Sequence, residues 1–168
     1  MRPLVAVAVA VLAALVVAGP ARPARRAGPV ITSAGVTGVH LGDRYRPLFR
    51  AGKVGAKAAG CELGGPQSVA RLKGPVKGGV TLSRSHPQRV IDIQITSGAT
   101  AGGVGHGDTL ADVRAAFPHV KLDHTTDEVF RLTLARVPQR DGGPFEFGLK
   151  LHSGRVFTIG VPRILFCD

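Results

Sequence analysis

The chain has 168 residues, 44% of them hydrophobic and 20% charged, and 22 Lys and Arg against 11 Asp and Glu give it a net charge of +11. This apolar content can form a hydrophobic core, which excludes a chain that is disordered throughout. The 23 Gly, 12 Pro and 5% aromatic residues exclude a coiled coil or helical bundle, and two cysteines are too few for a disulfide-dense miniprotein.

Residues 1–21 are predicted to be a secretory signal peptide. Arg2 precedes an unbroken apolar run from Leu4 to Ala18, which Gly19 and Pro20 follow. The run is shorter than the about 20 apolar residues that span a bilayer, and the arginines after it oppose an uncleaved anchor. We therefore expect a protein that is secreted or held in the cell envelope, with no stable membrane span after cleavage.

The next segment, residues 22–35, is rich in Ala, Arg, Gly and Pro and has no apolar period, so we expect a disordered basic tether. Residues 36–168 are then predicted to form a single domain. Comparison of the chain with itself at an offset of 65 aligns residues 38–51 with residues 103–116, and their glycines and aspartates coincide. The sequence therefore predicts two repeats, over residues 36–97 and 101–162.

Each repeat begins with a glycine-rich turn and one short amphipathic helix. In the second repeat, Thr109 and Asp112 have the spacing of a capping box, and Val113 and Phe117 lie on one helical face, together with Leu110. Pro118 ends this helix. The first helix has Arg44 at the cap position and Pro47 in its first turn, where proline is tolerated.

Period-two patterns after each helix predict β-hairpins. The first hairpin joins Val80–Ser83 to Val90–Thr96, the second joins Phe145–Leu151 to Val156–Val161, and a further strand covers Phe130–Leu134. The predicted fold is α+β: two tandem helix-plus-β-hairpin repeats that form an antiparallel sheet with short helices on one face. The alternation assigns nine residues to the apolar face under the helices: Ile91, Ile93, Ile95, Leu132, Leu134, Phe145, Phe147, Phe157 and Ile159.

Cys61 and Cys167 are predicted to form a disulfide, because exported thiols are generally oxidised. The bridge would close a loop of about 100 residues and contribute about 4–5 kcal/mol in the chain-entropy model. Two free thiols are the alternative.

The helix start G-V-x-x-G-D-x-x-x-x-[LV], repeated ahead of hairpins behind a signal peptide, resembles small secreted actinobacterial proteins of unassigned function. More distantly, residues 36–162 resemble the two-repeat fold of the beta-lactamase inhibitory protein and of small outer-membrane-assembly lipoproteins. This resemblance implies an extracellular enzyme inhibitor as one alternative function. The chain differs from the inhibitory protein in having one predicted inter-repeat bridge, no Trp, and Tyr45 as its only Tyr.

One cluster of residues could carry catalysis. His119, Asp123 and His124 lie between the second helix and the next strand, and they could serve a secreted hydrolase or a metal-dependent enzyme. The spacing does not place the two histidines on one helical face, as an HExxH motif would, and zinc enzymes usually need three protein ligands. A solvated loop is therefore the favoured interpretation. The glycine-rich run before Asp108 has no phosphate-loop lysine, and no serine lies in G-x-S-x-G. We expect no cofactor, no metal and no catalysis.

The function that these observations favour is a secreted non-catalytic binding module for an envelope or extracellular macromolecule. The positive charge would attract an anionic wall polymer or an acidic protein surface toward the protein. The alternative is that the charge only reflects the amino-acid composition. Export and the lack of interleaved aromatics argue against nucleic acid. The candidate residues are Arg46, Arg50 and Lys53 around the first helix, and Thr81, Asp92, Gln94, Thr96, Arg131, Thr133 and Lys150 on the polar sheet face, for which plain solvation is the alternative.

Overall fold

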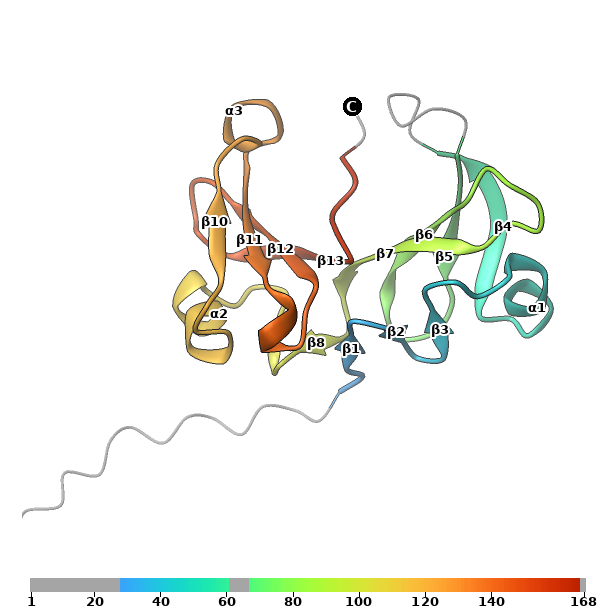
Figure 1. Cartoon of the computed structure of the whole chain (residues 1–168), viewed down its shortest axis with the longest axis horizontal. Coiled ribbons are helices and arrows are strands. Elements are labelled where there is room, and N and C mark those ends of the chain that lie inside the picture. The colour runs from blue at the N-terminus through green and yellow to red at the C-terminus, as the bar shows by residue number, and fades with distance from the viewer. Residues whose placement is uncertain (1–27, 61–66, 167–168) are drawn as a thin grey trace, which may run out of the picture.

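The computed structural model describes residues 28–60 and 67–166 and is mostly β, with short helices (Figure 1). The predicted signal peptide, Cys61 and Cys167 lie outside the described residues. No helix among the described residues is long and apolar enough to cross a membrane. The elements are β1 (Ile31–Thr32), β2 (Gly35–Val36), β3 (Val39–His40), α1 (Tyr45–Arg50), β4 (Val54–Ala59), β5 (Ser68–Leu72), β6 (Lys77–Leu82), β7 (Val90–Ser97), β8 (Thr100–Ala101), β9 (Val104–Gly105), α2 (Leu110–Ala116), β10 (Lys121–Asp123), α3 (Asp127–Phe130), β11 (Leu132–Val137), a 3-10 turn (Gln139–Asp141), β12 (Phe145–Lys150) and β13 (Val156–Val161).

One antiparallel sheet of eight strands, in the order β10-β11-β12-β13-β7-β6-β5-β4, dominates the structure. Its centre is the β13 and β7 pair, where Ile159 lies opposite Ile95 and Gly160 opposite Gln94. Both predicted hairpins are confirmed as the β6 and β7 pair and the β12 and β13 pair. The sheet is wider than predicted because it also contains β4, β5 and β10.

The helices α1 and α2 contribute to one hydrophobic core against the sheet. Leu48 of α1 and Val113 of α2 are buried in it. Phe117, directly after α2, packs its ring 6.1 Å from that of Phe145 and 5.6 Å from that of Phe147. The expected antiparallel sheet with short helices is confirmed, and the face opposite these helices is called the open face below.

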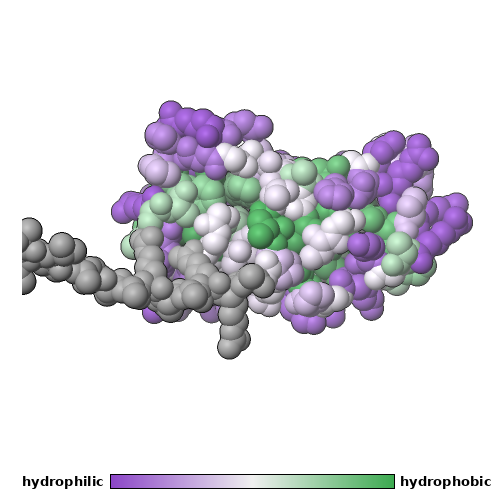
Figure 2. All heavy atoms as spheres, turned by 90° about the horizontal axis from the view of Figure 1, so that it is seen from below, coloured by the Kyte–Doolittle hydropathy of each residue, from purple (hydrophilic) through white to green (hydrophobic). Residues whose placement is uncertain are grey.

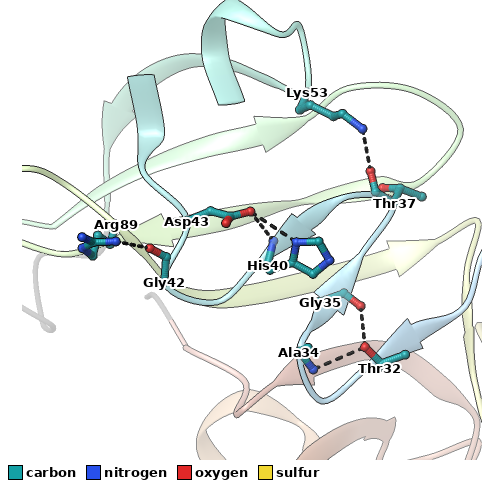
Figure 3. A network of polar contacts seen from close by, with 9 residues as sticks. All are labelled: Thr32, Ala34, Gly35, Thr37, His40, Gly42, Asp43, Lys53 and Arg89. Carbon is teal, nitrogen blue, oxygen red and sulfur yellow. Dashed lines mark hydrogen bonds and ion pairs between the residues drawn. The ribbon is translucent and has the colours of Figure 1, made fainter. Parts of the chain in front are cut away.

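A network of polar contacts between side chains and the backbone holds the turn before α1 (Figure 3). The backbone N–H of His40 donates to Oδ2 of Asp43 at 2.8 Å, and Nη1 of Arg89 donates to the carbonyl of Gly42 at 2.7 Å. The turn before α2 has the corresponding bonds at the corresponding distances, from Gly105 N to Asp108 Oδ2 and from Arg155 Nη1 to Gly107 O. The aspartates that coincide in the sequence therefore make the same contact in space.

The folded part begins earlier than the sequence predicts. β1 and β2 pair within residues 31–36, inside the segment predicted to be a disordered tether, and Ile31 is buried in the core. The cause is the apolar pair Val30 and Ile31, of which only Ile31 is covered, followed by a turn that lets the chain double back.

The register of β11 corrects another expectation. Residues 127–130 form α3, and Arg131 ends that helix with a left-handed φ of 56°, so the strand starts at Leu132. Ala135 lies opposite Phe147 and Val137 opposite Phe145, all in the core. Alternation then places Thr133 on the core face, and Leu132, Leu134 and Arg136 on the open face. The predicted faces of Leu132, Thr133 and Leu134 were therefore wrong. Phe157 and Ile91 were also expected on the apolar face, but Phe157 is 37% exposed and Ile91 is half-buried outside the core.

On the face seen from below, the polar surface lies away from the centre of the molecule. Seen from below, hydrophobic residues gather in the middle and hydrophilic residues at both ends (Figure 2). These ends correspond to the ends of the molecule that carry α1 and α2 in Figure 1.

Candidate functional site

The open face carries two adjoining hollows in the half formed by β4 to β7. The first, which we call the tail hollow, has a volume of about 230 Å³. The second, the edge hollow, has a volume of about 380 Å³. The tail hollow is lined by Gln67, Val69, Gly78, Gly79, Val80, Thr81, Gln94, Thr96 and Leu165, and the edge hollow by Gly55, Ala56, Ala58, Val69, Ala70, Arg71, Lys73 and Gly79. Val69 and Gly79 line both hollows, which are therefore continuous.

Small residues create this depression. Gly79 lies between Arg71 of β5 and Gln94 of β7, and a Cβ there would approach the carbonyl of Ala70 to 3.2 Å. On β4, Ala58 lies opposite Val69. Short side chains on neighbouring strands thus leave a depression. Longer side chains, such as that of Arg71, form its border.

The C-terminal segment, residues 162–166, crosses the open face at the centre of the sheet and rises from it in Figure 1. The backbone N–H of Ile164 donates to Oε2 of Glu146 at 2.7 Å. A Cβ on Gly160 would come within 2.3 Å of the carbonyl oxygen of Arg163, so glycine permits this close approach. Phe166 stacks on Phe130 with ring centroids 4.4 Å apart. The segment therefore covers part of the β10 to β13 half and borders the tail hollow through Leu165.

Asp92 lies beneath this segment and is 3% exposed. The Nε of Arg163 is 3.4 Å from its Oδ1, an ion-pair distance, but neither carboxylate oxygen accepts a hydrogen bond from the described residues. Burial raises the pKa of Asp92 to about 6, against the opposing effect of Arg163, and the charge of Glu146 adds to the rise. Asp92 therefore lies under the C-terminal segment and contacts it through Arg163.

A second charged group lies on the other half of the open face. Arg136 places Nη2 at 2.7 Å from Oδ2 of Asp123 and Nε at 3.1 Å from Oε1 of Glu146. Hydrogen bonds from Thr125 lower the pKa of Asp123, and the charge of Arg136 contributes. Asp123 is therefore engaged in a structural ion pair with Arg136.

In the structure, His119, Asp123 and His124 each pair with a different residue. Nδ1 of His119 lies 2.7 Å from Oδ1 of Asp141, and Nδ1 of His124 lies 2.8 Å from Oδ2 of Asp127. These hydrogen bonds lower the pKa values of Asp141 and Asp127. Among residues 28–60 and 67–166, no group of three His, Cys, Asp or Glu side chains could hold a metal ion.

The remaining predicted binding residues are dispersed. Arg46 and Arg50 are exposed on α1, and Lys53 donates to the carbonyl of Thr37 at 3.2 Å. Lys150 lies over the ring of Phe157, 4.9 Å from its centroid. Arg131 is exposed at the end of α3, and Thr133, 8% exposed, donates to Asp127 at 2.8 Å.

Of the predicted polar-face residues, three line the tail hollow: Thr81, Gln94 and Thr96. Sequence reasoning missed Arg71 and Lys73 as site residues because it did not predict β5. A signal was available in the alternation of Val69 and Arg71 with Ala70 and Leu72, which has the period of a strand.

Comparison of the chain with models of protein families, with curated proteins and with solved structures finds no match. The resemblance to secreted two-repeat proteins therefore stays a prediction.

Proposed function

We propose that the protein is a secreted, non-catalytic binding module that holds an anionic extracellular macromolecule on the open face of its sheet, in the β4 to β7 half. The observation that carries this proposal is the edge hollow. Both charged residues that line it, Arg71 and Lys73, are basic and exposed. A negatively charged group would find shape and charge together there.

The chemistry of the hollows supports binding over catalysis. The described residues that line them include no His, Cys, Asp or Glu. General acid–base catalysis most often uses His, Asp or Glu within hydrogen-bond reach of the substrate, and Lys73 is the titratable lysine in the lining. At the alternative site, His119 pairs with Asp141, His124 with Asp127 and Asp123 with Arg136. An enzyme inhibitor would be a special case of the proposed function, in which the bound macromolecule is an enzyme.

We further propose that the domain consists of two related units, residues 36–97 and 101–162, behind a cleaved signal peptide. The support is the matched pair of turn contacts at Asp43 and Asp108. N-terminal sequencing of the protein from culture fluid or envelope tests the cleavage. A first residue between Gly19 and Gly28 is expected, and intact Met1 in the membrane fraction would contradict it.

Affinity capture tests the proposed function. Immobilised mature protein is exposed to culture fluid and envelope extract, beside an Arg71→Glu/Lys73→Glu column and an Arg46→Glu/Arg50→Glu column with the same net charge. A bound anionic macromolecule should be lost from the first variant column and kept on the second. A macromolecule that all three columns retain equally would place binding elsewhere.

A further inference from the structure

The strand β4 ends the large sheet, and among the described residues only β5 pairs with it. The backbone N–H of Gly60 donates to the carbonyl of Gln67 at 2.8 Å, which fixes the bonding pattern next to it. Hydrogen-bonded and non-hydrogen-bonded pairs alternate along antiparallel strands. Ala58 therefore bonds to β5, while the N–H and C=O groups of Lys57 and Ala59 point away from it, toward the open edge.

A register shift between Val54 and Lys57 interrupts the first part of β4, and beyond it, over Lys57–Ala59, the described residues give the edge little protection. Sheet edges are commonly blocked by proline, by a charge pointing across the edge or by a very short strand. β4 has six residues and no proline. Its one charged side chain, Lys57, is engaged elsewhere: Nζ donates to Oε1 of Gln88 at 2.6 Å and lies 5.3 Å from the ring centroid of Tyr45.

Each side of this edge offers a different surface. On the helix side, the ring of Tyr45 stacks on Phe49 with centroids 5.6 Å apart, and Phe49 is 48% exposed. On the open face, Ala56 and Ala58 line the edge hollow with Arg71 and Lys73. A strand added to β4 would send alternate side chains to these two surfaces.

We infer that the partner is an extended protein segment with alternating acidic and apolar residues, which adds to the sheet as a further strand along β4. This inference rests on the proposed function and names the partner and its mode of binding. Backbone hydrogen bonds to Lys57 and Ala59 supply affinity, carboxylates in the edge hollow meet Arg71 and Lys73, and apolar side chains pack against Phe49.

A carbohydrate polyanion fits these observations less well than a protein segment. It would satisfy the charges of Arg71 and Lys73, but it presents no row of alternating N–H and C=O groups to the edge of β4. The exposed ring of Phe49 also favours an apolar side chain as its neighbour.

Hydrogen exchange tests the inference with two probes: an end-blocked synthetic peptide of alternating Glu and Val, and dextran sulfate. With the peptide, exchange of the Lys57 and Ala59 amides should slow by about tenfold or more. The amides of Ala58 and Gly60 are already bonded to β5 and should change little. This alternation along one strand is not expected from nonspecific charge attraction.

A substitution provides a second test. Ala59→Pro removes an N–H that points outward, where proline is tolerated in edge strands, and it should weaken peptide binding about tenfold. The matched control Ala59→Val keeps the N–H and should bind as the parent does. If the proline variant loses the amide spectrum of β4, the exchange pattern of the parent protein decides alone.

The outcomes separate the inference from the proposed function. If dextran sulfate binds and Arg71→Glu/Lys73→Glu weakens it, while the peptide gives no protection at Lys57 and Ala59, strand addition is wrong and the binding function stands. If neither probe binds at millimolar concentration, both proposals are wrong. Peptide protection confined to β10 would also overturn the assignment to β4.

Discussion

The guanidinium of Arg163 and the carboxylate of Asp92 form an ion pair across the centre of the sheet, with Nε 3.4 Å from Oδ1. Asp92 is in β7, and Arg163 is in the C-terminal segment that crosses the open face. Burying a carboxylate requires removal of its water, and one long contact to a guanidinium compensates only in part. The pair therefore fixes where the segment lies and which half of the open face stays accessible.

Replacement of Asp92 by Asn should change the pH dependence of stability. Because the folded pKa of about 6 is above the ordinary value of 3.8, the carboxyl contributes stability that is fully present below pH 3.8 and lost as the pH rises through 6. Asn has no such dependence. The free energy of unfolding of the variant, relative to the parent, should therefore rise by roughly 2–3 kcal/mol between pH 3.5 and 7.

Urea unfolding at a series of pH values measures this difference. Parallel stability curves for the parent and Asp92→Asn would show that the carboxyl has the same pKa in the folded and unfolded chains. Below pH 3.8 the parent also loses contributions from Asp123, Asp127 and Asp141, whose pKa values are lowered, but the variant shares these losses.

Replacement of Arg163 by Ala should destabilise the protein most above pH 6, where Asp92 is ionised and left without its partner. We expect a loss of roughly 1–3 kcal/mol at pH 7, because Arg163 is half exposed, and a smaller loss at pH 4. Arg114→Ala, an exposed arginine on α2, is the control and should change little at either pH. An equal loss at both pH values would argue that Arg163 acts by packing alone.

The N-cap residues of α2 and α1 allow a matched pair of substitutions. Thr109 accepts a hydrogen bond from the backbone N–H of Asp112 at 3.3 Å, and Asp112 accepts one from the N–H of Thr109 at 3.0 Å, as the predicted capping box requires. Thr109→Ala should lower the free energy of unfolding by about 1 kcal/mol. Arg44, at the cap of α1, makes no side-chain cap bond, so Arg44→Ala should have a clearly smaller effect in the same thermal unfolding experiment.

The predicted Cys61 and Cys167 bridge can be tested directly. Both cysteines lie outside the described residues, so the pairing is a prediction from the sequence. Non-reducing peptide mapping should recover the two cysteines in one linked fragment, and Cys61→Ser should lower the thermal midpoint. Two free thiols in the mature protein would contradict the prediction.

The parts of the fold that the sequence predicts are those with strong local signals. β7 alternates isoleucines with polar residues from Ile91 to Thr96, β13 is rich in β-branched residues, and Thr109 with Asp112 marks the start of α2. β4 has the sequence VGAKAA, whose glycine and alanines have low strand propensity, so pairing with β5 places it in the sheet. In β11, the left-handed Arg131 shifts the register in a way that alternation alone does not reveal.

The candidate site was predicted in part for the same reason. Thr81, Gln94 and Thr96 follow from the period of β6 and β7, and they line the tail hollow. The edge hollow depends on the pairing of β4 with β5, and the burial of Asp92 depends on a contact with Arg163, which lies far along the chain. Contacts of that range leave no pattern in a single sequence.

The most direct test of the account compares two charge reversals with the same net change. Dextran sulfate binding is measured by calorimetry for the parent, Arg71→Glu/Lys73→Glu and Arg46→Glu/Arg50→Glu, at about 50 and 200 mM salt, a range in which exposed charges become increasingly screened. The account predicts a loss of about tenfold or more in affinity for the sheet variant and less than about threefold for the α1 variant. Equal losses of affinity in the two variants would contradict a binding site on the open face. They would show that dextran sulfate is attracted by the positive charge of the whole surface.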